Sequence, residues 1–131
     1  MQTTALICIN DPMDRDLLKL VMQREEIHFQ VIDSPQDLVG LVLEAEPMLL
    51  FLDVLLPGVN GLDAVANIKN QMQARAPLVA VVSSLAFPEI VTKAQKSGVD
   101  EFITKPLDAD QLRSRLNRML NKALSAGVKK S

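Results

Sequence analysis

The sequence predicts an α/β fold in which five parallel strands form a doubly wound sheet flanked by five helices. Short apolar runs of strand length occur at residues 5–9, 29–32, 48–52, 78–82 and 102–103. Segments with the apolar spacing of amphipathic helices separate these runs. The central runs are apolar throughout, which is typical of strands covered on both faces. Strands that alternate with helices are joined by crossover connections, so they lie parallel in one sheet with helices on both sides.

The first helix is expected over about residues 13–25. Asp11 is a candidate N-cap, and Pro12 stands at the start of the helix, where proline is favoured. The helix carries the apolar residues Leu17, Leu18, Leu20 and Val21. These signals start the helix directly after the first strand.

The second helix has the clearest pattern in the sequence. Ser34 is the candidate N-cap, Pro35 takes the first helical position, and Asp37 completes the arrangement of a capping box. Pro47 ends the helix, because proline cannot continue the backbone hydrogen bonding of a helix.

The remaining helices have similar start and stop signals. A third helix is expected over about residues 62–74, and a fourth begins near Pro88 and ends at Gly98, a residue type favoured just after a helix. Asp108 is the candidate N-cap of the fifth helix. The side chains expected to face inward from the fifth helix are Leu112, Leu116, Met119 and Leu120.

Length and composition predict one globular domain over residues 1–126 and a disordered tail over residues 127–131. The chain has 131 residues, of which 48% are hydrophobic and 23% charged. No apolar stretch reaches the length needed to cross a bilayer. The first residues lack the basic region and cleavage site of a secretory signal. We therefore expect a cytoplasmic protein with no membrane partner.

Charge and cysteine content exclude several kinds of function. The net charge of -2 argues against direct nucleic-acid binding through a broad basic surface. Basic residues concentrate only on the last helix, where they complement the helix dipole or face a partner. The single cysteine, Cys8, lies in an apolar run and is expected to be a buried thiol. One cysteine and one histidine cannot form the usual Cys/His zinc site.

Polar residues gather where the predicted strands end. They are Asn10, Asp11, Asp53, Ser83, Ser84 and Lys105. The carboxyl ends of parallel strands meet at one edge of the sheet, where ligands bind in folds of this class. Oxygen donors and one ammonium group together can hold Mg²⁺ or receive a phosphoryl group. The glycines lie in turns rather than in a phosphate-binding loop after the first strand, so no nucleotide cofactor is expected. The carboxylates of the loop after the first strand would repel an anionic flavin cofactor, so none is expected either.

Three motifs in order resemble one known family. The matches are an apolar strand followed by Asp-x-x-x-Pro-Gly-x-x-Gly at Asp53, Pro57, Gly58 and Gly61, a hydroxyl at Ser83, and Lys-Pro at Lys105 and Pro106. Over about residues 4–124 the chain resembles the CheY-like receiver domain of two-component response regulators. The resemblance implies a flavodoxin-like fold with strand order 2-1-3-4-5.

The resemblance also implies a phosphorylation switch. Asp53 would accept a phosphoryl group from a histidine kinase, a phosphotransfer protein or a small acyl phosphate. Lys105 and Ser83 would each contact a phosphoryl oxygen, and the backbone carbonyl of Leu55 would join Asp53 as a ligand of Mg²⁺. The peptide bond between Lys105 and Pro106 would be cis. Such a domain is a signalling module whose only chemistry is its own phosphoryl transfer and hydrolysis.

The family implies how this switch would be transmitted. Its output surface is formed by the fourth helix, the fifth strand and the fifth helix, and it contacts a downstream effector. Phe102 lies where the family keeps an aromatic relay residue that responds to movement of Ser83. Phe102 is alternatively only a packed strand residue. Homodimerisation through the last helix is also compatible with the resemblance.

The end of the first strand departs from the family pattern, which has two adjacent acidic residues there. An alignment anchored on the first helix puts Ile9 and Asn10 at the pair and Asp11 at the next position, and we favour it. A one-residue shift would make the pair Asn10 and Asp11. Asparagine keeps an oxygen ligand but lacks the negative charge that a hard cation needs, so Mg²⁺ is predicted to bind weakly.

Two interpretations of function follow from this departure. The first is a phosphorylatable receiver with reduced metal affinity, and the retained Asp53, Ser83 and Lys105 favour it. The second is an atypical receiver that acts as a protein interaction module independently of phosphate, and the missing acidic pair favours that.

Overall fold

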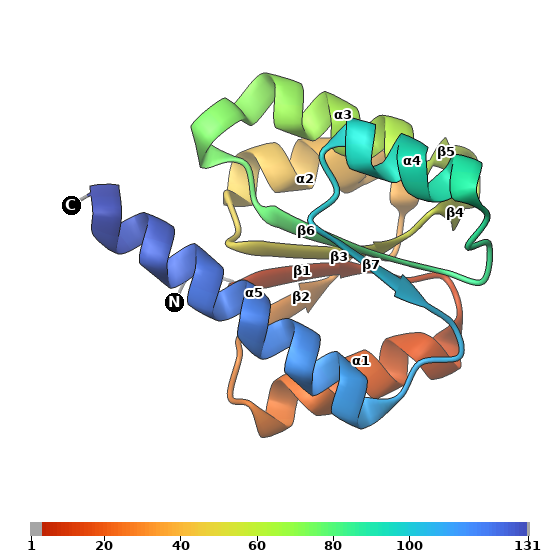
Figure 1. Ribbon diagram of the computed structural model, residues 1–131, viewed down its shortest axis with the longest axis horizontal. Helices are drawn as coiled ribbons and strands as arrows, with labels where there is room; N and C mark the ends of the chain where they lie inside the picture. Colours follow the sequence, from red (N-terminus) through yellow and green to blue (C-terminus); the bar gives the residue numbers. More distant parts are fainter. Residues whose placement is uncertain (1–3, 131) are drawn as a thin grey trace.

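A single parallel sheet forms the centre of the molecule (Figure 1). The computed structural model describes the backbone of residues 4–130 and the side chains of residues 4–125. The strands of the sheet are β1 (Ala5–Cys8), β2 (Phe29–Val31), β3 (Leu49–Asp53), β6 (Leu78–Ser83) and β7 (Glu101–Thr104). All neighbours pair in parallel, in the order β2-β1-β3-β6-β7. Counted along the chain, this is the predicted order 2-1-3-4-5, so the predicted fold class is confirmed.

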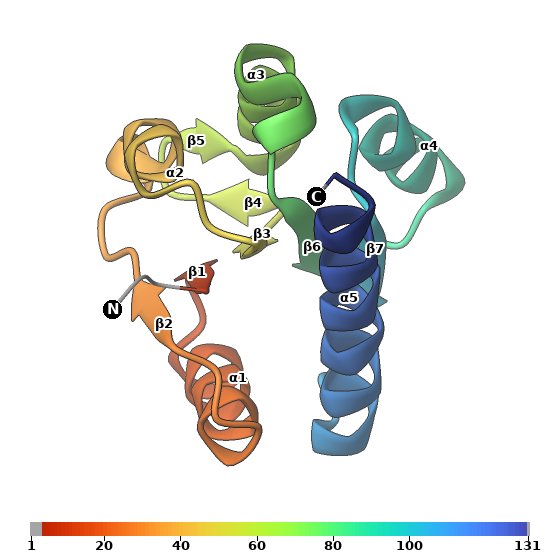
Figure 2. The same cartoon turned by 90° about the vertical axis from the view of Figure 1, so that its left-hand side faces the viewer.

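Helices cover both faces of the sheet (Figures 1 and 2). One face is covered by α1 (Pro12–Arg24) and α5 (Ala109–Lys130), and the other by α2 (Leu38–Ala45), α3 (Gly61–Met72) and α4 (Pro88–Ser97). The backbone of α5 continues into the predicted tail at residues 127–131, whose side chains lie outside the described residues, so disorder there stays a prediction. No helix in the described part of the chain is long and apolar enough to cross a membrane.

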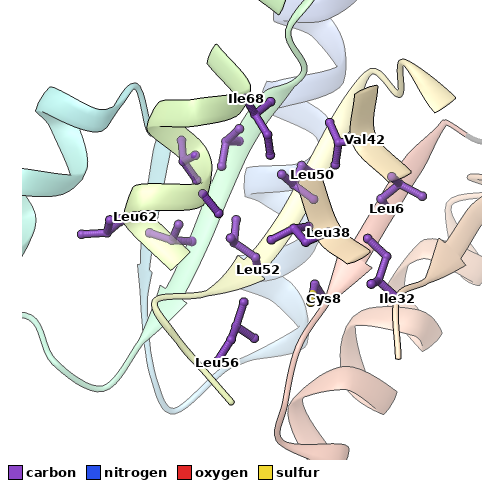
Figure 3. Packing of buried hydrophobic residues seen from close by; sticks show 14 of the residues in the cluster. Leu6, Cys8, Ile32, Leu38, Val42, Leu50, Leu52, Leu56, Leu62 and Ile68 are labelled. Atoms are coloured by element: carbon purple, nitrogen blue, oxygen red, sulfur yellow. The ribbon is translucent and has the colours of Figure 1, made fainter. Parts of the chain in front are cut away.

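The central strands β1, β3 and β6 are almost entirely apolar because each contributes alternate side chains to two separate cores. Leu50 and Leu52 point toward α2 and α3, where Figure 3 shows them packed among leucine and isoleucine side chains. Leu49 and Phe51 point the other way, into the core formed with α1 and α5. The core on the α2 and α3 side is called the upper core below, and the core on the α1 and α5 side the lower core.

The predicted helix signals are confirmed in part. Asp11 caps α1 through its side-chain oxygen, and Gly98 ends α4 in the left-handed conformation. The capping box at Ser34 is wrong, because its side chain makes no capping hydrogen bond. Residues 35–37 instead form a 3₁₀ turn, η1 (Pro35–Asp37), in which the Asp37 N–H donates to the Ser34 carbonyl at 2.9 Å. The donor that a capping side chain would have satisfied is therefore already bonded to the backbone.

A small antiparallel hairpin between β3 and α3 was not predicted. It consists of β4 (Leu55–Leu56) and β5 (Val59–Asn60). Its turn residues are Pro57 and Gly58, and Gly58 has a φ of +69°, which glycine adopts readily. Asn60 then caps α3 by accepting hydrogen bonds from two backbone N–H groups. The hairpin thus returns the chain to the sheet edge where Asp53 ends β3.

A second 3₁₀ turn, η2 (Gln73–Arg75), follows α3.

Candidate functional site

A polar pocket lies at the carboxyl ends of the central strands, as the fold class requires. Its volume is about 230 Å³. The pocket is lined by Asn10, Asp11, Asp53, Leu55, Val82, Ser83, Ser84, Leu85 and Lys105. The structure therefore brings together all the residues predicted from the sequence to bind a phosphoryl group or a metal ion. Phe102, the predicted relay, is not among the lining residues.

Asp53 is a buried carboxylate whose two oxygens each have a partner. The residue is only 4% exposed. Its Oδ2 accepts a hydrogen bond from the backbone N–H of Asn10 at 2.6 Å, and its Oδ1 lies 2.9 Å from the Lys105 ammonium. Burial of a carboxylate is costly unless it is paired and hydrogen-bonded, and both conditions are met here. The end of the sheet thus holds one carboxylate at a fixed position facing the pocket.

Gly61 lies in close contact with the backbone at the end of β3. A Cβ atom at position 61 would lie 2.3 Å from the Asp53 carbonyl oxygen and 2.7 Å from that of Val54. The Gly61 N–H donates to the Val54 carbonyl at 2.8 Å. The last glycine of the motif therefore permits α3 to begin directly against the end of β3.

Lys105 contacts two carboxylates rather than one. Its Nζ lies 2.9 Å from Asp53 and 3.1 Å from Asp14. Burial alone would lower the pKa of Lys105, but the hydrogen bonds and charges of Asp53 and Asp14 outweigh it and raise that pKa. The backbone of Lys105 is bonded to the Ser83 carbonyl at 2.9 Å, and the peptide bond to Pro106 is cis, as predicted.

Asp14 was not predicted as a site residue. It lies in the first turn of α1, and α1 begins at the edge of the sheet where the pocket opens. Its place in the sequence could have indicated this role, because a side chain in the first turn of a helix that directly follows a strand lies close to the strand ends. Helical spacing alone does not tell which carboxylate of the first turn reaches the lysine.

The structure shows what the residues at the end of β1 do. Ile9 is 3% exposed and belongs to the lower core, so it offers the pocket no ligand. Asn10 lines the pocket and donates its backbone N–H to Asp53. Asp11 also lines the pocket, but its Oδ1 accepts from the N–H groups of Met13 and Asp14 at 2.8 and 3.2 Å. Asp11 thus has the capping role expected from the sequence.

Ser83 and Phe102 lie on neighbouring strands. Ser83 is 5% exposed, and its hydroxyl oxygen accepts a hydrogen bond from the Leu85 N–H at 2.9 Å. Phe102 pairs with Val81 in the sheet, two positions before the pairing of Ser83 with Thr104. Its side chain is partly buried and packs against the upper core.

The Cys8 thiol takes no part in the pocket. It is 1% exposed within the upper core. Burial, with a smaller contribution from the charge of Asp53, raises the pKa of the Cys8 thiol to about 11. Cys8 is therefore a protonated core residue at neutral pH, as its apolar context predicted.

Comparison with known proteins identifies the family. The family model of the response regulator receiver domain matches residues 5–117. The chain belongs to the response regulator receiver domain family. Receiver domains are signalling modules of two-component systems rather than enzymes in the ordinary sense, and they interact with histidine kinases and downstream effectors.

Several curated proteins are similar to this receiver. The DNA-binding response regulator MtrA of Mycolicibacterium smegmatis is 26% identical over 122 residues, which are 93% of this chain and 52% of MtrA. The regulatory protein LuxO of Vibrio cholerae is 30% identical over 100 residues, covering 75% of this chain and 21% of LuxO. PilH of Pseudomonas aeruginosa is 25% identical over 118 residues, covering 88% of this chain and 98% of PilH. The chain spans about half or less of the length of MtrA and LuxO.

Solved receiver structures have the same fold. NtrX of Brucella abortus superposes with a TM-score of 0.83 at 26% identity, over 99% of this chain and 29% of that one. The chemotaxis response regulator CheY4 of Vibrio cholerae superposes with a TM-score of 0.78 at 15% identity, over 90% of this chain and 99% of that one. At this lower identity the likeness shows the fold alone.

Receiver domains generally bind Mg²⁺ at an acidic site, and this receiver offers oxygen donors with little charge. Among the residues that the structure describes, no group of three acidic, histidine or cysteine side chains could hold a metal ion. Asp53 is the one carboxylate that lines the pocket and does not cap a helix. One of its oxygens already accepts a hydrogen bond from Asn10, and the other forms an ion pair with Lys105. The donors fit a hard cation in kind, but one carboxylate provides little of the charge such a cation needs.

Proposed function

We propose that this receiver is phosphorylated on Asp53 and acts as a switch in two-component signalling. The observation that carries the proposal is the pair of contacts to Asp53, which is fixed at the strand end with the Lys105 ammonium at 2.9 Å. A fixed oxygen nucleophile beside a cation suits phosphoryl transfer, because that reaction depends on positioning and on neutralising charge. The proposed donor is a histidine kinase or a phosphotransfer protein, in the cytoplasm as expected from the sequence.

The proposed reaction is an in-line displacement at phosphorus. A carboxylate oxygen of Asp53 forms a bond to phosphorus while the bond from phosphorus to the donor's histidine nitrogen breaks, and the leaving nitrogen keeps the electron pair. Lys105 then donates to one phosphoryl oxygen and the Ser83 hydroxyl to another. If Mg²⁺ is bound, Asp53, the Asn10 side chain and the Leu55 carbonyl would hold it, weakly, and it would neutralise charge on the phosphoryl group.

The proposed output surface is formed by α4, β7 and α5. Ser83 must give up its bond with the Leu85 N–H to reach a phosphoryl oxygen, so its movement would alter the β6–α4 loop. Phe102 is the proposed relay on β7. It lies two residues before Thr104, which pairs with Ser83 in the sheet. The proposed readers of this surface are a downstream effector protein or domain, or a second copy of the chain.

A receiver that works independently of phosphate is the second candidate function. The observation that favours it is Ile9, because this core residue takes the place of an acidic ligand and leaves the pocket short of charge. In that case the chain would serve as a protein interaction module with a constant conformation.

Intact-mass spectrometry after incubation with acetyl phosphate separates the two functions. We expect one phosphoryl adduct in the native protein, more of it with Mg²⁺ at high concentration, and none in Asp53→Asn. Asp16→Asn, an exposed carboxylate on α1, is the matched control and should form the adduct normally. Absence of any adduct at high Mg²⁺ and long incubation would reject the phosphorylation proposal and favour the interaction module.

A further inference from the structure

Lys105 is held between two carboxylates that come from different parts of the fold. Asp53 ends β3, whereas Asp14 belongs to the first turn of α1. The Nζ distances are 2.9 Å to Asp53 and 3.1 Å to Asp14. The exposed fraction of the side chain is 6% for Asp53, 19% for Asp14 and 24% for Lys105. This is a partly buried cluster in which ion pairs are screened less than on the surface.

The neighbouring residues of the pocket do not duplicate the contact from Asp14. Ile9 is apolar and buried in the lower core. Asn10 contributes its backbone N–H to Asp53, and Asp11 is engaged in capping α1. Within the described part of the chain, Asp14 and Asp53 are the only carboxylates paired with Lys105. The position of the ammonium therefore depends on α1 as well as on the sheet.

We infer that Asp14 is a positioning residue that anchors Lys105 from α1 and keeps its ammonium aimed at Asp53 before and after phosphoryl transfer. This inference rests on the proposed function and names a residue that the strand-end motif does not include. An ammonium has three N–H donors. One can stay on Asp14 while another moves from the Asp53 carboxylate to a phosphoryl oxygen, so the lysine need not be released when the charge at Asp53 changes.

If Asp14 acted only through its negative charge, its removal would raise the phosphorylation rate, whereas loss of an anchor for Lys105 would lower it. A negative charge near the pocket repels an anionic phosphoryl donor, so removal of that charge would speed its capture. Lys105 lies between Asp14 and any anion bound at Asp53, so its positive charge offsets part of this repulsion. Lysine has a long flexible stem, and without a second partner its ammonium would sample other positions. Anchoring therefore outweighs repulsion, and the two roles differ in the sign of the effect on rate.

The test compares Asp14→Asn with Asp16→Asn, which removes the same charge from an exposed position of the same helix. In Asp14→Asn we expect a lower ¹⁵N order parameter for the Lys105 ammonium and a loss of about tenfold in the phosphorylation rate at saturating acetyl phosphate. Asp16→Asn should change neither quantity. Asp14→Glu should restore most of the rate, and Asp14→Ser should reproduce the loss if Asp14→Asn folds poorly.

The outcomes separate this inference from the proposed function. An unchanged ammonium order parameter in both Asp14→Asn and Asp14→Ser would overturn the inference, as would a faster phosphorylation rate in either variant. If the native protein forms no adduct, the proposed function fails, and the order parameter still decides whether Asp14 positions Lys105.

Discussion

At the scale of single residues, the pocket depends on a few side chains whose charge or size no neighbouring residue supplies. Asp53, Ser83 and Lys105 were predicted from the sequence because polar residues directly after apolar strands must lie at one edge of a parallel sheet. Asp14 escaped prediction because its role comes from which way a first-turn side chain points, and sequence spacing does not fix that direction. Ile9 was aligned with an acidic position from the sequence, but only the structure shows its side chain in the lower core.

Gly61 gives a prediction at this scale. Gly61→Ala should lower the free energy of unfolding by at least about 2 kcal/mol, because its Cβ would lie 2.3 Å from a backbone oxygen that cannot move aside. The measurement is urea denaturation at neutral pH.

Gly40→Ala is the matched control for this change. Gly40 lies within α2, and a Cβ added there would meet no neighbouring group within 4 Å, so alanine should raise the stability by about 0.5–1 kcal/mol. Equal effects at both positions would contradict the close approach that we describe at Gly61.

At the scale of secondary-structure elements, two acidic residues join β7 to the surrounding helices: Asp100, just before the strand, and Glu101, its first residue. Asp100 pairs with Lys69 of α3 at 3.0 Å and accepts the Val79 N–H at 2.8 Å. Glu101 pairs with Arg115 of α5 at 2.7 Å and also with Arg118. The basic concentration on the last helix is therefore engaged in part with β7. The elements themselves were predicted from periodicity, whereas the β4 and β5 hairpin was missed because two-residue strands have no measurable period.

Glu101 gives a pH-dependent prediction at this scale. Burial alone would raise the pKa of Glu101, but the hydrogen bonds and charges of Arg118 and Arg115 outweigh it and lower that pKa from its ordinary value of 4.5. The stabilisation from these ion pairs is therefore complete above pH 4.5 and is lost as the pH falls through the lower folded-state pKa.

Glu101→Gln should therefore destabilise the protein by about 1–2 kcal/mol at neutral pH, because both arginines retain access to water. The difference from the native protein should vanish in acid. Urea denaturation of both proteins from neutral to acidic pH measures it, and Asp110→Asn, whose carboxylate is exposed, is the control. A difference that stays constant with pH would contradict the assignment to ion pairing.

At the scale of the whole molecule, the sheet separates two cores that share only its backbone. The parallel pairing was predicted from the alternation of strands and helices, whereas the order of the strands was implied by the resemblance to the receiver family. Separate cores on opposite faces should contribute independently to stability while the sheet makes unfolding cooperative.

Conservative truncations in the two cores test this independence. Ile68 lies in the upper core and Ile103 in the lower core, and both are fully buried. Ile68→Val and Ile103→Val should each cost about 0.5–1.5 kcal/mol, and the double variant should equal their sum within about 0.5 kcal/mol. Urea denaturation followed by circular dichroism and by NMR should give coincident single transitions. Separate transitions would indicate that the two cores unfold as different units.

The strand order also has a consequence for chains shortened at the carboxyl end. Beyond β3, the sheet continues with β6 and then β7, so these strands extend one edge in chain order. Lys105, the counter-ion of Asp53, follows directly after the last of these strands. A chain that ended before residue 105 would lack this counter-ion, and burial of Asp53 in it would be uncompensated. The segment that completes the sheet thus also carries the charge that makes burial of Asp53 tolerable.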